Sequence, residues 1–150
     1  MPDHRPFEYS EITPLIFVGT NACCRDHFNE MLLARGIRAD ISLEDDKIDA
    51  PFGADFYVWL PTPDHAAPAA EELEFGVAAL QRLEKMGVAC YVHCRNGHGR
   101  ASTLVASFLA AKEGWTAEQA IIFVKERRPR VHFEKVQTAA IGEFAKRQHA

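Results

Sequence analysis

The sequence lacks the features that would place the protein in a membrane, outside the cell or on nucleic acid. No apolar run approaches the length of a helix that spans a bilayer. The first residues, MPDHRPFEYSE, are polar and contain prolines, unlike a secretory signal. A formal net charge of −4 disfavours general binding to DNA or to anionic lipid. We therefore expect a cytoplasmic protein with no DNA partner and no stable membrane attachment.

Cysteine is also scarce, and its spacing excludes two common uses. The chain has 4 cysteines, namely Cys23, Cys24, Cys90 and Cys94. A chain of this length without a secretory signal does not point to a disulfide framework. No CxxC pair is present, so we expect no structural zinc site. A redox partnership of Cys23 or Cys24 with Cys94 is left open.

Internal repeats, low-complexity tracts and linkers are absent as well. A chain of 150 residues with 47% apolar and 25% charged residues has the make-up of an ordinary soluble globular protein. This length suits one hydrophobic core. We therefore expect a single domain over residues 1–150, and a monomer.

The apolar pattern of the chain predicts alternating strands and helices. Strands are expected at 14–20, 37–43, 55–60 and 88–92, and the last is apolar enough to be a buried central strand. Helices are expected at 21–36, 69–87, 101–114, 117–128 and 134–148. This order predicts an α/β fold with a central, mostly parallel sheet flanked by helices on both faces.

The richest stretch is VHCRNGHGRAS at residues 92–102, between the buried strand and an apolar helix. Two glycines give its backbone the freedom to point successive N–H groups at one centre, and such a turn before a helix binds anions. Arg100 adds a planar fork that matches two phosphate oxygens. The same N–H groups and charge favour the thiolate form of Cys94. The stretch therefore predicts a nucleophile within an anion cradle.

A second candidate segment is PTPDHAAP at residues 61–68, whose three prolines exclude regular structure. In a parallel sheet it lies at the same edge as Cys94, because ligands bind beyond the carboxyl ends of the strands. Asp64 is our candidate for the general acid that protonates a leaving oxygen. His65 beside it is the other candidate.

These segments resemble the cysteine-dependent protein tyrosine phosphatases, and the order of the elements resembles their dual-specificity branch. HCRNGHGR matches the family's HCxxGxxR signature, and PTPDHAAP fits its Pro-x-x-Asp-x-x-x-Pro acid loop. PLIFVGT resembles the first strand of the family, ISLED a later strand with its acidic turn, and RPRVHFEKVQ an Arg-Pro-x-Val segment followed by glutamine. The resemblance covers nearly the whole chain and implies a dual-specificity phosphatase-like fold.

The resemblance also implies a mechanism without metal or other cofactor. Cys94 would attack phosphorus and form a phosphocysteine, Asp64 would protonate the leaving group, and His93 would help to keep the pKa of Cys94 low. The phosphate would be held by the loop that follows the cysteine. Its members are Arg95, Asn96, Gly97, His98, Gly99 and Arg100.

The chain departs from the family at Ala101, where serine or threonine is usual. That hydroxyl is thought to assist breakdown of the phosphocysteine. Ser102 is a candidate substitute, but a shift of one residue turns a helical side chain by about 100°. The hydrolysis step is therefore the one in question.

The expected activity is hydrolysis of phosphotyrosine, phosphoserine or phosphothreonine in proteins. Basic character at Arg95 and His98 keeps open a phosphoinositide, an inositol phosphate or another small phosphorylated substrate. Ala101 keeps open a phosphate-binding module with little catalysis. A sulfurtransferase or an arsenate reductase is disfavoured, because neither reaction needs a general acid at Asp64.

Overall fold

The structure is a computed structural model that describes residues 7–23 and 28–149. Five strands form one sheet in the order β1-β2-β5-β3-β4. All neighbouring strands are parallel except β1, which runs antiparallel to β2 at the edge. The strands are β1 (Tyr9–Thr13), β2 (Ile16–Gly19), β3 (Ile37–Ser42), β4 (Phe56–Trp59) and β5 (Ala89–His93). The predicted α/β fold with a mostly parallel sheet is confirmed.

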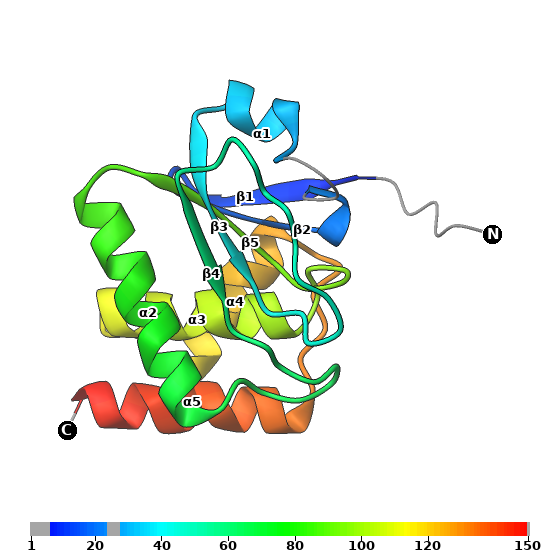
Figure 1. The fold of residues 1–150 in the computed structure, drawn as a ribbon. Helices are drawn as coiled ribbons and strands as arrows, with labels where there is room; N and C mark the ends of the chain where they lie inside the picture. Colours follow the sequence, from blue (N-terminus) through cyan, green and yellow to red (C-terminus); the bar gives the residue numbers. More distant parts are fainter. Residues whose placement is uncertain (1–6, 24–27, 150) are drawn as a thin grey trace.

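Helices cover both faces of the sheet, but unequally, as Figure 1 shows. Four long helices pack on one face, and the short α1 lies on the other. Their bounds are α1 (Glu30–Ala34), α2 (Ala70–Lys85), α3 (Arg100–Glu113), α4 (Ala117–Arg127) and α5 (Lys135–His149).

Strand β5 shows how the sequence divides between the two cores. Its side chains alternate, so Cys90 and Val92 enter the core under the long helices, while Ala89 and Tyr91 enter the core under α1. Both faces of β5 are buried, and this explains why the strand reads as a continuous apolar run. The carboxyl end of β5 then delivers the next residues to the edge of the sheet.

The predicted helix at 21–36 is wrong in extent over its described part, and residues 24–27 of that range lie outside the described residues. A short 3₁₀ turn, η1 (Asn21–Cys23), follows β2, and α1 begins only at Glu30. Asn29 caps α1 by accepting from the N–H of Met31, and the N–H of Phe28 donates to the carbonyl of Phe52. These contacts fix a new start for the helix, and one of them comes from a distant loop. Strand β1 was not expected either.

The predicted start and end of α4 are confirmed. Thr116 and Gln119 form a reciprocal capping box, with the hydroxyl of Thr116 accepting from the N–H of Gln119 at 3.2 Å. The helix ends before Pro129, and the chain then runs back toward the carboxyl edge of the sheet. This return brings residues 128–134 beside the candidate site.

Candidate active site

Cys94 lies directly beyond the carboxyl end of β5, as predicted, and its thiol is free and buried. The residues after it form what we call the cysteine loop (residues 94–99), which leads into α3 at Arg100. Gly97 has φ +69°, a left-handed conformation that side chains rarely adopt. A strand end and a helix start therefore hold the thiol and the loop in fixed positions.

Three backbone carbonyls of the cysteine loop accept hydrogen bonds from groups that lie outside the loop. The carbonyl of Arg95 accepts from the N–H of Asn21 at 3.3 Å. The next two carbonyls, of Asn96 and Gly97, accept from the guanidinium of Arg128 at 2.9 and 3.0 Å. In a trans peptide the N–H points opposite to the carbonyl, so the N–H groups after these carbonyls point the other way. This arrangement is that of an anion cradle.

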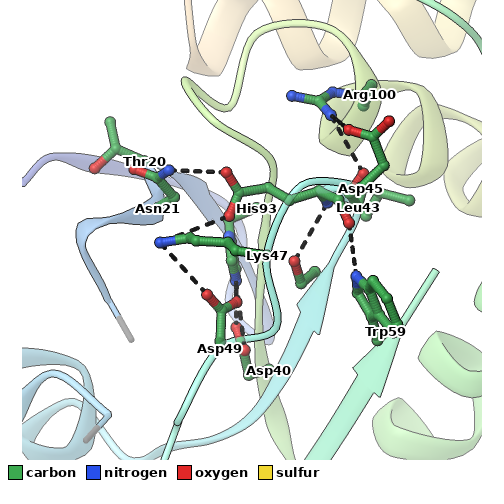
Figure 2. Close-up of polar contacts among 12 residues, drawn as sticks. Thr20, Asn21, Asp40, Leu43, Asp45, Lys47, Asp49, Trp59, His93 and Arg100 are labelled. Carbon is green, nitrogen blue, oxygen red and sulfur yellow. Dashed lines mark hydrogen bonds and ion pairs between the residues drawn. The ribbon is translucent and has the colours of Figure 1, made fainter. Parts of the chain in front are cut away.

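Arg100 is buried, with 4% of its surface exposed, and Figure 2 shows its guanidinium beside Leu43 and Asp45. Nη1 donates to the carbonyl of Thr62 at 2.8 Å and lies 3.5 Å from the carbonyl of Leu43. Asp45 and Asp64 each place a carboxylate oxygen 3.7 Å from it. Within residues 7–23 and 28–149, no hydrogen-bond acceptor reaches its buried Nε. A fixed arginine with an unused donor is suited to an oxyanion.

The segment 61–68, which we call the proline loop, brings Asp64 to the site. Asp64 Oδ1 lies 3.7 Å from Nη2 of Arg100, so the structure brings these two predicted residues together. Its carboxyl group is 61% exposed, where a proton can be exchanged with solvent. Gln137, at the start of α5, donates from Nε2 to the carbonyl of Ala66 at 3.0 Å and so ties the loop down.

His93 lies under the cysteine loop, fully buried between two carboxylates (Figure 2). Nε2 is 3.1 Å from Oδ1 of Asp40 on β3 and 3.1 Å from Oδ2 of Asp49 in the loop after β3. Burial alone would lower the pKa of His93, but Asp40 and Asp49 outweigh it and raise the pKa to about 10. The two carboxylates thus favour the charged form of the residue before Cys94, and its supporting role toward Cys94 stays a prediction.

The acidic loop (residues 44–54) is fixed around this histidine. Asp49 also lies 3.7 Å from Nζ of Lys47. Glu44 accepts from the side chain of Asn21 at 2.8 Å, and burial raises the pKa of Glu44 while this bond opposes the rise. Two groups of buried side chains place possible metal ligands within 4.8 Å of one another: Cys23, Asp40 and His93, and Glu44, Asp49 and His93.

A pocket opens over the cysteine loop, and the described residues that line it include no aliphatic side chain and no phenyl ring. Three of the lining residues are histidines. The lining residues are Asp64, His65, Asn96, His98, Gly99, His132, Glu134 and Gln137. Predicted phosphate-loop members therefore border a polar pocket together with the general-acid candidate.

The remaining predicted residues lie close by. Ser102 Oγ donates to the carbonyl of Gly97 at 3.3 Å, so it supports the cysteine loop from α3, and Ala101 is fully buried. Arg95 is exposed. Cys94 is a free thiol in this structure and Cys24 lies outside the described residues, so a redox partnership of Cys94 with Cys23 or Cys24 stays a prediction.

Sequence reasoning missed several residues that hold the site. Arg128, Asp49 and Asp45 were not singled out, and neither was Glu134. Arg128 stood in the quoted RPRV segment, and Asp45 in ISLED, so the resemblance carried a signal for both. Asp49 gave no local signal, because it sits in a loop that looked solvated.

Comparisons with known proteins agree on one family. The profile of the dual specificity phosphatase catalytic domain matches residues 21–147. The chain is 30% identical over 79 residues to the human protein "Phosphatidylglycerophosphatase and protein-tyrosine phosphatase 1". It is 35% identical over 78 residues to the Arabidopsis thaliana protein "Phosphatidylglycerophosphate phosphatase PTPMT1". These matches cover 53% and 52% of this chain, but only 39% and 23% of the two relatives.

Solved structures support the fold over almost the whole chain. A crystal structure of human DUSP28 has a TM-score of 0.82 at 20% identity and covers 93% of this chain and 97% of that one. The crystal structure of PTPMT1 in complex with PI(5)P has a TM-score of 0.84 at 22% identity and covers 94% and 96%. The profile match, which spans the cysteine loop and the proline loop, shows that this chain belongs to the dual specificity phosphatase catalytic-domain family.

Proposed function

We propose that this chain is a phosphomonoesterase that works through a phosphocysteine and needs no metal. The observation that carries the proposal is the cradle: Arg128 holds the carbonyls of Asn96 and Gly97 on one side of the loop that begins at Cys94, so the N–H groups that follow them point the other way, and the buried Arg100 closes the loop. Phosphoryl transfer needs mainly positioning and stabilisation of charge on the equatorial oxygens, and the cradle supplies both.

The reaction divides into two steps at the same loop. The thiolate of Cys94 forms a bond to phosphorus as the bond from phosphorus to the leaving oxygen breaks, and Asp64 gives its proton to that oxygen. Asp64 then takes a proton from water, which attacks phosphorus, and the bond from sulfur to phosphorus breaks to release inorganic phosphate. His93 is held between Asp40 and Asp49 directly before Cys94 and so fixes the start of the loop in both steps.

The polar pocket supports a substrate whose alcohol is small and hydroxyl-bearing, such as a phosphorylated glycerol or inositol headgroup. A phenyl ring would meet His65, His98 and His132 rather than apolar walls. Relatives with phosphatidylglycerophosphatase in their names favour the same class.

Among the described residues, no helix combines the length and apolar character needed to cross a bilayer. Cytoplasmic location and a monomeric state stay predictions.

A phosphoprotein substrate is the second candidate. It is favoured by the match to mouse dual specificity phosphatase 28, which is 26% identical over 126 residues and covers 83% of this chain. The two candidates differ in what must fit beside His98, namely a polyol or a peptide side chain.

A substrate panel in EDTA tests the proposal. Phosphatidylglycerophosphate, a phosphoinositide, an inositol phosphate, a phosphotyrosine peptide and a phosphoserine peptide are compared on one preparation, with Cys94→Ser as the control. We expect turnover that depends on Cys94, and a higher kcat/KM for the polyol phosphates. If the protein binds phosphate but turns over no substrate, it is a binding module. A preference for phosphotyrosine would establish the second candidate.

A further inference from the structure

We propose that Glu134 is a positioning residue for the general acid, and that it acts through the side chain of His65. The inference rests on the function proposed above, because it concerns the proton that Asp64 donates. Glu134 lies just before α5 and faces the proline loop, and the two segments run side by side at one end of the molecule (Figure 1).

The starting observation is the backbone of the turn that carries Asp64. The N–H of Ala66 donates to the carbonyl of Pro63 at 3.0 Å, so Asp64 and His65 form the centre of a four-residue turn. His65 has φ +67°, and among the described residues it is the one non-glycine residue with a positive φ. Glycine or asparagine is usual at such a position, because a side chain is strained there. A strained residue persists when its surroundings hold it, and such residues gather at functional sites.

Two carboxylates lie near the imidazole of His65, which is largely exposed. Its Nδ1 lies 3.6 Å from Oε1 of Glu134, and its Nε2 lies 3.7 Å from Oδ2 of Asp64. Oε1 of Glu134 also lies 3.1 Å from Nε2 of His132, which orients the carboxylate. The imidazole of His65 thus stands between the general acid and a fixed anionic group.

The base of Glu134 is anchored to the same loop. Its N–H donates to Oε1 of Gln137 at 2.8 Å, and Nε2 of that glutamine donates to the carbonyl of Ala66. Gln137 is 1% exposed, so the connection is rigid. Glu134 therefore contacts the turn at His65, and Gln137 binds the turn one residue later, at Ala66.

This arrangement should affect only reactions in which Asp64 must give a proton to the leaving oxygen. A general acid must lie within hydrogen-bond reach of the leaving oxygen. A shift of His65 out of the left-handed conformation would turn the adjoining peptide and move the carboxyl of Asp64 away from Arg100. The cradle itself, held by Arg128 from another side, would be unaffected.

The dependence on the leaving group tests the proposal. We would measure kcat/KM of the full chain with phenyl phosphate, whose leaving group needs a proton, and with 2,4-dinitrophenyl phosphate, whose leaving group does not. Because the contacts of His65 are exposed, we expect Glu134→Ala to reduce turnover of phenyl phosphate by about three- to tenfold. We expect turnover of dinitrophenyl phosphate to stay within about twofold of wild type. Glu143→Ala, an exposed glutamate on α5, is the matched control.

A double-mutant cycle tests the route through His65. His65→Gly removes the imidazole while glycine accepts the positive φ, so in that background Glu134→Ala should change phenyl phosphate turnover no further. Equal losses with both substrates, no loss with either, or additive losses in the cycle would each overturn the proposal. Absence of Cys94-dependent turnover of dinitrophenyl phosphate by the wild type would instead overturn the proposed function.

Discussion

Replacing Arg128 with methionine should destabilise the protein and abolish phosphate binding together, because the same side chain holds the backbone of the cysteine loop. Arg128 is 2% exposed and donates to the carbonyls of Asn96 and Gly97 at 2.9 and 3.0 Å. A hydrogen bond from a charged donor contributes about 1.5–3 kcal/mol, and methionine keeps part of the packing. We therefore expect the free energy of unfolding to fall by about 3–5 kcal/mol. Binding of inorganic phosphate should be lost, because the carbonyls of the loop are no longer held outward.

Arg128 also contacts the carboxylate of Glu8 and lies 3.0 Å from Oγ of Ser10, and a matched variant separates these bonds. The side chain of Glu8 is 38% exposed, so Glu8→Gln should cost at most about 1 kcal/mol and leave phosphate binding intact. Urea denaturation followed by tryptophan fluorescence measures stability, and calorimetry measures phosphate binding. The reasoning fails if Arg128→Met unfolds within about 1 kcal/mol of wild type, or if Glu8→Gln costs as much.

Three further predictions address the loop, the second chemical step and the buried histidine. A Cβ at Gly97 would lie 2.6 Å from the carbonyl oxygen of Gly19, and φ is +69°. Gly97→Ala should therefore lower stability by at least about 2 kcal/mol in urea denaturation and abolish phosphate binding, whereas Gly142→Ala, in open space on α5, should not destabilise. Ala101→Ser should restore the hydroxyl that is usual in the family and accelerate breakdown of the phosphocysteine severalfold. The pre-steady-state burst measured by rapid quench should then shrink. An unchanged burst would show that Ala101 does not limit this breakdown. The pKa of His93 is raised from an ordinary 6.5 to about 10, so its stabilisation is complete below pH 6.5 and is lost as the pH rises toward 10. Thermal midpoints should fall over that range and fall less in His93→Gln; equal slopes would contradict the assignment.

The sequence predicted the parts of the site whose reactive residues lie close together in the chain, next to a recognisable strand and helix. The strand expected at 88–92 is β5 at Ala89–His93, and the helix expected at 101–114 is α3 at Arg100–Glu113. The glycines, the thiol and the arginine are close together in the chain, so their spacing alone indicates a cradle. Asp64 followed because parallel strands bring their carboxyl ends to one edge.

The supports of the site could not be predicted in the same way, because they join distant segments. Arg128 is 31 residues from Gly97 and 120 residues from Glu8, and nothing in local periodicity links these positions. Asp49 lies in an irregular loop with no local pattern that marks it, yet it contacts the buried His93 on β5. The error at 21–36 has a similar cause, since Phe52 binds the backbone of Phe28 just before α1.

The bond from Arg100 to the carbonyl of Thr62 has a consequence for the end of the reaction. An arginine that is free in solution loses up to about 2 kcal/mol of rotamer freedom when a ligand immobilises it. Here the guanidinium is already immobilised by the backbone of the proline loop, so an incoming phosphate does not have to order it. Inorganic phosphate, the product, meets the same preorganised arginine as the substrate. Departure of the product is therefore slowed by the feature that favours substrate capture, and the protein should be sensitive to product inhibition.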